Sequence, residues 1–223
     1  MNWLTNYKIP IGPWAKDVDW LTTNLKFFFD FIAIVLDGGI SAMLFVLQGS
    51  FLKGTALEDV YPLFMILVFT GIAWLMRKSV GVAVFTLLGL LLILNQGYWK
   101  ETMETLALVL AAATVSMVIG IPIGIAAARR PWLYATIRPI LDLMQTIPTF
   151  VYLIPALILF GLGMVPGLIA TVIFAVPAPI RLTRLGIIST PPSLVEAAQA
   201  FGATPRQVLT KVELPFAKPQ IMA

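Results

Sequence analysis

Long stretches without a charged residue alternate along the chain with short basic or acidic segments. The uncharged stretches are 60–76, 79–99, 105–128 and 143–180. A transmembrane helix needs about 20 apolar residues, so each of the first three stretches predicts one span. The fourth stretch, at 38 residues, is too long for one helix. It predicts two spans joined at the turn-forming residues 161–167.

Five membrane helices follow from this pattern, at 60–76, 80–94, 105–128, 145–160 and 168–180. The last two are short and contain prolines, which remove backbone hydrogen bonds inside a helix. Carbonyl groups freed in this way are tolerated at membrane depth only where they are buried in protein or face a water-filled cavity. The sequence therefore predicts an all-α integral membrane protein in which the 145–180 hairpin lines a path.

Two glycines in the middle of the third predicted span indicate a close helix contact. Gly120 and Gly124 are four residues apart and lie on one face of the helix. Small residues at this spacing are typical of interfaces at which the backbones of two membrane helices approach each other closely. We expect a second helix of the chain to pack against this face.

The segment 27–47 is apolar enough to span a membrane, but polar residues recur on one helical face at spacings of seven, four and seven. These residues are Asp30, Asp37, Ser41 and Gln48. A carboxylate at the bilayer centre costs about 2.5–3.5 kcal/mol on insertion scales, whereas an interfacial helix keeps it in water. The pattern favours an amphipathic interfacial helix over a sixth span. It places the segment 1–59 outside the membrane or at its outer interface, with the N-terminus outside.

Composition supports a membrane protein and excludes several kinds of chemistry. Hydrophobic residues make up 59% of the chain and charged residues only 12%, and the sequence contains no Cys and no His. Disulfides, thiol nucleophiles, imidazole bases and the usual zinc sites are therefore excluded. We expect no catalytic residue, no metal site and no cofactor in this chain. Residues 1–20 lack the apolar core and cleavage site of a signal peptide.

Basic residues define one side of the predicted topology. If Arg77 and Lys78 are cytoplasmic, alternation of the spans places ten of the 15 Lys and Arg residues on that side. The opposite side receives an acidic-leaning set that includes Glu58, Asp59 and Glu101. This asymmetry satisfies the positive-inside rule and predicts a multi-pass membrane protein.

The polar segment 190–215 predicts two short helices on the cytoplasmic side. The first has a capping box formed by Ser193 and Glu196 and is expected to stop at Gly202, the residue type preferred just past a helix end. The second begins at Thr204-Pro205 with Gln207 three residues after the cap, and is expected to end by 214–215.

One face of the first short helix is apolar and mostly small, and it must be covered. The face consists of Leu194, Ala197, Ala198 and Phe201. The cover could be the membrane helices of the chain itself or a groove on a partner protein. A helix-turn-helix for DNA is disfavoured, because the second helix carries only Arg206 and Lys211 and phosphate binding needs several contacts. We expect no nucleic-acid partner.

The same segment resembles a known motif. Glu196-Ala197-Ala198, three residues, Gly202, nine residues and Val212-Glu-Leu214-Pro215 resemble the Glu-Ala-Ala loop of bacterial ABC importer permeases, with Val in place of Ile. Over 108–186 the chain further resembles the glycine betaine and proline betaine (osmoprotectant) permeases. The sequences that carry this likeness are LDLMQTIP at 141–148, FVYLIP at 150–155, VPG at 165–167 and IRLT at 180–183.

This resemblance implies a transport subunit of the bacterial cytoplasmic membrane with several partners. Two permease copies form the pathway, two cytoplasmic ABC ATPases drive it, and an extracytoplasmic binding protein delivers the betaine. ATP and Mg²⁺ would belong to the ATPase, since this chain has no phosphate-binding Gly-x-x-x-x-Gly-Lys-Ser/Thr sequence. The residues implied to couple the permease to the ATPase are Glu196, Ala197, Ala198, Gly202, Val212, Leu214 and Pro215. Membrane lipid surrounds the spans, and residues 60–223 form the transmembrane domain.

Residues of the first hairpin arm are the candidates for the substrate path, because aromatic faces attract a quaternary ammonium. They are Gln145, Pro148, Thr149, Phe150, Tyr152 and Pro155, with Phe160 as a further aromatic. The alternative for these side chains is ordinary helix packing. Asp142, beside Arg138, is expected to form an ion pair at a helix end.

Two alternatives to betaine import stay open at the level of sequence. Choline or carnitine permeases have the same pattern, and a membrane scaffold that only sequesters an ATPase would also keep the loop. The permeases that the chain resembles continue with further spans after the Leu-Pro sequence, so we expect the transmembrane domain to be incomplete at residue 223.

Overall fold

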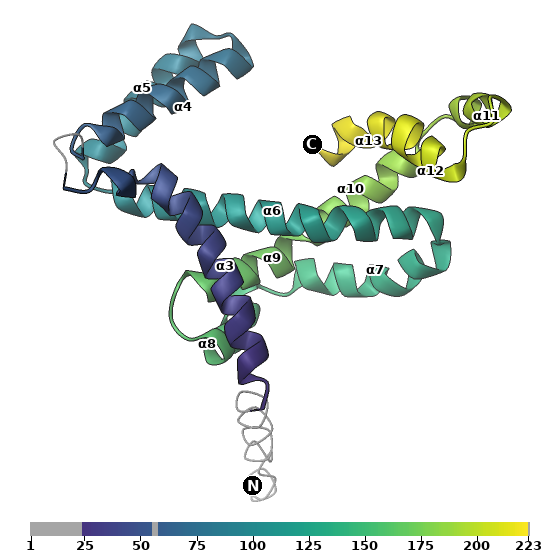
Figure 1. Cartoon of the computed structure of the whole chain (residues 1–223), viewed down its shortest axis with the longest axis horizontal. Helices are drawn as coiled ribbons and strands as arrows, with labels where there is room; N and C mark the ends of the chain where they lie inside the picture. Colours follow the sequence, from purple (N-terminus) through teal and green to yellow (C-terminus); the bar gives the residue numbers. More distant parts are fainter. Residues whose placement is uncertain (1–23, 55–57, 223) are drawn as a thin grey trace, which may run out of the picture.

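The computed structural model describes residues 24–54 and 58–222, and every regular element within these two ranges is helical (Figure 1). The prediction of an all-α fold is confirmed. The predictions for the first 20 residues lie outside the described ranges. The elements are α3 (Lys26–Leu47), η1 (Ser50–Leu52), α4 (Tyr61–Arg77), α5 (Val80–Asn95), α6 (Trp99–Arg129), α7 (Pro131–Thr146), α8 (Thr149–Phe160), α9 (Met164–Ala175), α10 (Pro177–Ile188), α11 (Pro192–Ala200), α12 (Pro205–Val208), η2 (Leu209–Glu213) and α13 (Leu214–Ile221).

The long helix α6 lies at the centre of the structure, and α3, α7, α9 and α10 contact it. Its 31 residues extend over about 46 Å at 1.5 Å per residue, which exceeds the hydrocarbon thickness of a bilayer. In Figure 1 α7 returns alongside α6 after a tight turn, and α10 continues from α9 across α6 toward α12 and α13. The expected span at 105–128 therefore lies within α6.

A close helix crossing joins α6 to α10 at the two glycines that the sequence singled out. A Cβ atom on Gly124 would lie 2.7 Å from the carbonyl oxygen of Ile180 and 2.7 Å from Cβ of Thr183. A Cβ atom on Gly120 would lie 2.6 Å from Cγ of Pro179. These distances are shorter than van der Waals contact, so only glycine permits the crossing. The predicted close helix contact is confirmed, and its partner is α10.

The helix α3 packs across α6 and α9. Ile40 of α3 is buried together with Ala111 and Ala112 of α6 and Leu168 of α9, and Leu47 is buried with Met103. The helix also has the length and mean hydropathy of a membrane span. Asp30, Asp37 and Ser41 are exposed on it. No bilayer position is defined by these contacts, so the interfacial orientation of this segment stays a prediction.

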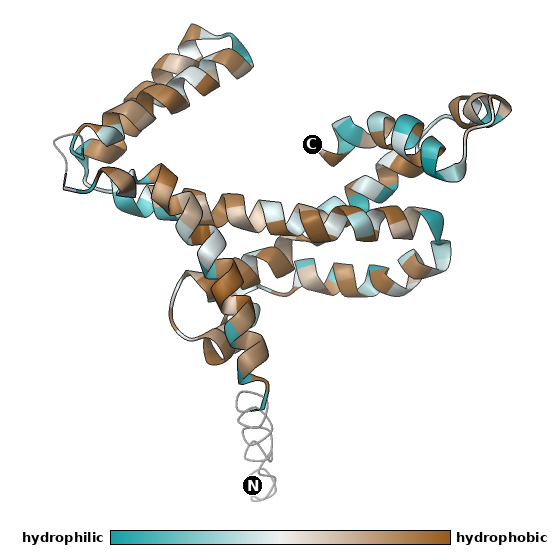
Figure 2. Cartoon of the chain, viewed as in Figure 1, coloured by the Kyte–Doolittle hydropathy of each residue, from teal (hydrophilic) through white to brown (hydrophobic). Residues whose placement is uncertain are grey.

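The helices α4 and α5 form a hairpin that lies apart from the other helices (Figure 1). Most of this hairpin is coloured hydrophobic in Figure 2, and α5 contains no buried residue. Polar residues gather instead at the α6–α7 turn and over α12 and α13. Exposed apolar helices separated from polar ends are what a bilayer requires of a membrane protein.

The first arm of the 145–180 hairpin differs from the prediction of a single helix over 145–160. Helices α7 and α8 are bent by 93° at the break between them, and Gln145 lies in α7 rather than α8. The cause is Pro148, since a residue before proline disfavours the helical region. Ile147 accordingly has an extended ψ of 129°. The second arm runs longer than expected, because the apolar helix Met164–Ile188 continues past residue 180.

Three helices among the described residues have the length and hydropathy of a span, namely Lys26–Leu47, Trp99–Arg129 and Met164–Ile188. The bent pair α7 and α8 could form a fourth. The helices α4 and α5, at 17 and 16 residues, are apolar but shorter. Each of the five predicted spans thus corresponds to apolar helix.

Substitution of Gly124 by valine tests the α6–α10 crossing. Overpacking of this kind costs about 1–3 kcal/mol, which corresponds to a melting temperature lower by about 2–12 °C for a chain of this size. The measurement is the thermal unfolding of the detergent-solubilised protein. Gly89→Val in α5 is the control, since a Cβ atom there meets nothing within 4 Å. Equal melting temperatures for the two variants would contradict the crossing.

Candidate functional site

The 190–215 loop begins where α10 ends and holds α11 outside the helix bundle. The hydroxyl of Ser189 donates a hydrogen bond to the carbonyl oxygen of Gly186 at 3.0 Å, which closes the end of α10. Pro191 is the N-cap of α11 and Pro192 its first residue. Proline suits the first position of a helix because its fixed φ is already helical and no N–H is lost.

The predicted capping box of Ser193 and Glu196 is wrong. The helix begins two residues earlier than this box requires, and no side chain caps it. Two consecutive prolines set the helical start at Pro192, so Ser193 is already inside the first turn and its side chain cannot act as the N-cap.

The C-terminal end of α11 is fixed by a Schellman motif. The N–H of Gly202 donates to the carbonyl oxygen of Gln199 at 2.8 Å, and the N–H of Ala203 donates to that of Ala198 at 3.0 Å. Gly202 has a φ of +79°, a left-handed conformation that glycine adopts without steric cost. The expected stop at Gly202 is confirmed.

The predicted start of the second short helix at Thr204, with Gln207 three residues later, is confirmed as a capping box. The N–H of Thr204 donates to Oε1 of Gln207 at 2.8 Å, and the N–H of Gln207 donates to the Thr204 hydroxyl at 3.4 Å. The loop between α11 and α12 is therefore short and hydrogen-bonded at both ends.

The helix that starts here does not end by 214–215 as expected. It passes through the π-helical turn η2 and continues as α13 to Ile221. A proline in an α-helix clashes with the carbonyl group four residues earlier. The wider π turn immediately before Pro215 relieves this clash, so the chain passes the proline without a break.

The motif divides into an exposed half and a buried half. On α11, Glu196 and Ala197 are exposed and Ala198 is half-buried. Phe201, at the C-cap, is 94% exposed. Val212 and Leu214 are half-buried next to the buried Glu213, and Pro215 is exposed. The structure thus leaves the apolar face of α11 uncovered by the described residues of the chain.

Charged contacts surround the base of this loop. The Arg129 guanidinium at the end of α6 lies 2.5 Å from the Glu213 carboxylate, and the Arg184 guanidinium carbon of α10 lies 3.7 Å from the centroid of the Tyr134 ring. Sequence reasoning missed both contacts. They join residues far apart in the chain, so no local sequence pattern predicts them.

The predicted ion pair of Asp142 is confirmed and has a second partner. Asp142 Oδ1 lies 2.5 Å from the Arg181 guanidinium of α10, and the Arg138 Nε is 4.0 Å from Asp142 Oδ2. Asp142 therefore joins α7 to α10, whereas the sequence indicated a contact only within α7.

The path candidates gather at the start of α8, beside a cavity between α8 and α9. This cavity has a volume of ≈ 210 Å³ and is lined by Thr149, Phe150, Leu153, Gly167, Ala170, Thr171 and Phe174. Phe150 is 74% exposed, so one of its faces is open. Sequence reasoning included Thr149 and Phe150 but missed Thr171 and Phe174. Thr171 and Phe174, a polar and an aromatic residue three positions apart in the second apolar arm, could have been recognised from the sequence as lining candidates.

The remaining candidates lie around this cavity rather than in it. Gln145, Pro148 and Pro155 are exposed, and the hydroxyl of Tyr152 donates to the carbonyl oxygen of Leu143 at 3.4 Å. Phe160 packs edge-on against Phe29 of α3 with ring centroids 5.5 Å apart. Phe160 therefore contacts α3, and its place in the path stays a prediction.

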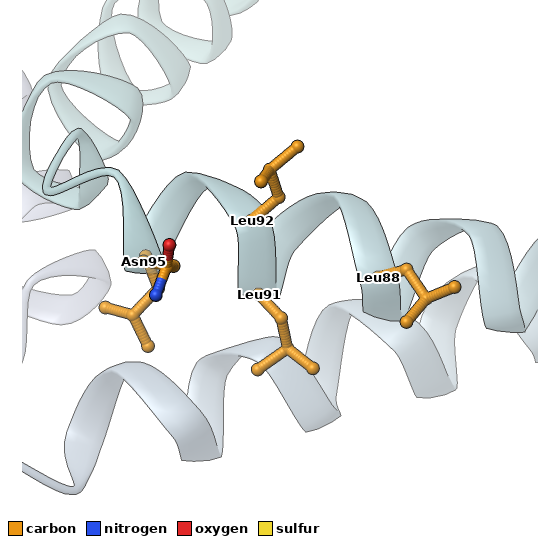
Figure 3. Close-up of a pocket in the computed structure, with 5 residues that line it drawn as sticks. Leu88, Leu91, Leu92 and Asn95 are labelled. Atoms are coloured by element: carbon orange, nitrogen blue, oxygen red, sulfur yellow. The ribbon is translucent and has the colours of Figure 1, made fainter.

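A second hollow lies on α5 and has a different character. Leucines and a single amide, Asn95, line it (Figure 3). It lies on the exposed apolar hairpin, where acyl chains are the expected contact, and it contains none of the aromatic or charged groups that a charged solute requires.

Comparison with known proteins identifies the family. Residues 120–223 match the family described as binding-protein-dependent transport system inner membrane component. The chain is 45% identical over 208 residues to the glycine betaine transport system permease protein OpuAB of Bacillus subtilis, covering 92% of this chain and 69% of the relative. The chain belongs to this permease family. It is a multi-pass inner-membrane protein and a subunit of an importer.

Two further relatives have similar identity. The glycine betaine/carnitine transport permease protein GbuB of Listeria monocytogenes is 44% identical over 220 residues, which are 96% of this chain and 74% of the relative. The glycine betaine/proline betaine transport system permease protein ProW of Escherichia coli is 45% identical over 216 residues, which are 96% of this chain and 58% of the relative. The family resemblance noted in the sequence is confirmed.

Replacement of Gly202 tests the turn that ends α11. Gly202→Val places a β-branched residue at a positive φ and raises the rate of amide hydrogen exchange at 202 and 203 by about tenfold. Gly202→Asn is the control, since asparagine tolerates the left-handed conformation. Hydrogen exchange measured by mass spectrometry reports both variants. Equal protection in the two would show that the turn does not depend on its backbone conformation.

Proposed function

We propose that this permease is the membrane subunit of an ATP-driven importer for glycine betaine or a related quaternary-ammonium osmoprotectant. Its α11 binds a separate cytoplasmic ABC ATPase, which holds the ATP and Mg²⁺, and an extracytoplasmic binding protein supplies the solute. Two permease copies form the path in this proposal. The names of the three relatives, all of which include glycine betaine, support the substrate class.

The observation that carries the ATPase contact is the uncovered face of α11. Leu194 is 45% exposed and Phe201 94% exposed, with Ala197 and Ala198 between them. Small side chains allow a partner to approach the helix closely, and one aromatic at the end can fill a pocket on it. Because both ends of the loop are hydrogen-bonded, the helix meets its partner without losing much conformational freedom. Glu196 and Gly202 act here with Val212, Leu214 and Pro215, which anchor the loop.

The proposed orientation places the 190–215 loop and the α6–α7 turn in the cytoplasm, with the N-terminus outside. The polar ends of the molecule support it, because Arg129, Arg130 and Arg206 all lie near the loop end of the molecule, as the positive-inside rule requires. The 60–223 region forms the transmembrane domain, and the exposed apolar faces of α4 and α5 contact lipid.

The α8–α9 cavity is the proposed contact for the solute in the path. Phe150 and Phe174 lie on its two walls, and Thr149 and Thr171 supply hydroxyl groups. Aromatic faces attract a trimethylammonium group by cation–π interaction, and hydroxyl groups can donate to a carboxylate. The nearby Gln145, Pro148, Tyr152 and Pro155 complete the candidate lining on the exposed side.

Ala198→Trp tests the ATPase contact. A bulky side chain in the close interface costs about 1–3 kcal/mol, so binding of the ATPase weakens by about 5- to 150-fold and betaine-stimulated ATP hydrolysis is lost. The measurement is ATPase affinity and hydrolysis with the complete transporter in proteoliposomes. Ala113→Trp, at an exposed position of α6, is the control. Normal stimulated hydrolysis in Ala198→Trp would refute this contact.

Phe150→Ala tests the path. Loss of one cation–π contact of about 0.5–2 kcal/mol raises the solute concentration for half-maximal uptake by about 2- to 30-fold. Uptake of labelled glycine betaine by proteoliposomes, driven by ATP with excess binding protein, is the measurement. Phe85→Ala on α5, where the side chain is 80% exposed, is the matched control. An unchanged half-maximal concentration in Phe150→Ala would contradict the assignment.

The same experiment separates the two alternatives. A scaffold would bind the ATPase and show no uptake of labelled betaine. A carnitine or choline permease would take up that solute in preference to glycine betaine, and the name of the GbuB relative, which includes carnitine, favours carnitine as the solute to compare first.

A further inference from the structure

A buried ion pair ties the base of the 190–215 loop to the end of α6. The Glu213 side chain is 9% exposed, and its Oε2 lies 2.5 Å from a terminal guanidinium nitrogen of Arg129, whose side chain is 42% exposed. The two residues are 84 positions apart. A carboxylate this deeply buried is stable only with a partner, and Arg129 is the partner that the structure gives it.

This pair is the only ion pair or side-chain hydrogen bond of the described residues that joins α6 to the segment 191–222. On its other side the segment is held by α10. Gly186 packs against Ala217 so closely that a Cβ atom on the glycine would lie 2.6 Å from that of Ala217. The hydroxyl of Ser189 also donates to Oε1 of Gln220 at 3.3 Å. The loop is thus anchored to two different membrane helices by different interactions.

The π-helical turn places Glu213 at this contact. The turn η2 covers Leu209–Glu213, and Glu213 is its buried residue. A π turn holds one more residue per hydrogen-bonded ring than an α turn, and such turns are frequent at functional sites. The wider turn shifts the face on which Glu213 lies relative to a continuous α-helix. The same turn accommodates Pro215, so backbone geometry and charge placement depend on one feature.

The two anchors have different physical character. The contact with α10 consists of apolar packing and one exposed hydrogen bond between neutral side chains, and packed helices tolerate small sliding movements. The contact with α6 is a charged pair with one member buried, which cannot separate without leaving an unpaired buried carboxylate. When α11 is displaced, the Arg129–Glu213 pair therefore either stays intact and moves α6 with it, or breaks.

We infer that Arg129 and Glu213 are positioning residues that transmit displacement of α11 to α6, so that ATP hydrolysis and solute movement stay coupled. This inference rests on the proposed function, in which α11 contacts the ATPase. Neither residue touches the solute or the ATPase in this role. Both act through the attachment of the loop to α6, whose other contacts with α10 at Gly120 and Gly124 lead to the path.

The Asp142–Arg181 pair does not have this role. Its carboxylate side chain is 52% exposed, so its loss leaves a solvated charge and a small energetic effect. It joins α7 to α10, and neither helix is part of the loop. Glu213, unlike Asp142, is buried, has a single charged partner and lies at the base of α11 and α12.

The test is the ratio of labelled betaine taken up to ATP hydrolysed, measured on the complete transporter in proteoliposomes. Glu213→Gln keeps the shape of the side chain and removes its charge. We expect it to retain ATPase binding and ATP hydrolysis while the ratio falls about tenfold, a typical size for coupling between sites. Arg129→Gln is expected to give the same fall. Glu104→Gln, in the exposed Lys100–Glu104 pair at the other end of α6, keeps the wild-type ratio.

Exchange of the two charges separates positioning from general stability. The Arg129→Glu/Glu213→Arg variant restores the pair, and its ratio is expected to return toward that of the wild type. Size-exclusion chromatography identifies variants that fail to fold, and if the exchanged variant fails, the two Gln variants decide. A folded Glu213→Gln transporter with the wild-type ratio would overturn the inference, and so would a folded exchanged variant as uncoupled as the single ones.

The control proteins separate this result from a failure of the proposed function. If wild-type and Glu104→Gln transporters take up betaine and the Gln variants at 129 and 213 are uncoupled, both proposals hold. If wild-type transporter binds the ATPase without uptake, the proposed function fails first, and the inference fails with it.

Discussion

Close approach of α6 and α10 is the constraint on which the rest of the structure depends. Gly120 and Gly124 bring the backbone of α6 against Pro179, Ile180 and Thr183, at distances that no larger residue allows. The helix α10 continues from α9, which forms one wall of the α8–α9 cavity, and leads into α11, which carries the exposed motif. One crossing therefore holds the cavity and the loop to the same long helix.

The two parts of the motif lie in different environments, which explains why they are separated along the chain. The part on α11 is exposed and small, which suits contact with another protein. The part around Glu213 faces inward and attaches the loop to α6 and α10. A helix with fixed ends and a fixed base moves as a rigid body, and rigid-body movement is a common way to carry a change at one site to another. The two halves of the motif thus contribute contact and attachment.

Local sequence was sufficient for those features that local chemistry determines. Charge-free stretches gave the apolar helices because burial of a charge in lipid is costly, and Gly202 and Thr204 marked a helix end and a helix start. Prediction failed where two local signals competed, since Pro191 and Pro192 override the Ser193 box, and the π turn carries the helix past Pro215. The 93° bend between α7 and α8 and the pairs of Arg129 with Glu213 and of Arg181 with Asp142 depend on tertiary placement. No spacing rule relates residues that are 84 or 39 positions apart.

The account claims above all that α6 and the 190–215 loop move together when the ATPase closes. The chain contains no Cys, so spin labels can be placed at Val118 of α6 and Gln199 of α11 alone, both exposed positions. Pulsed electron paramagnetic resonance on the complete transporter, with labelled permease diluted into unlabelled permease, measures the distance between them within one chain. The account predicts the same distance in the nucleotide-free and ATP-bound transporter. A distance that changes when ATP binds would contradict it.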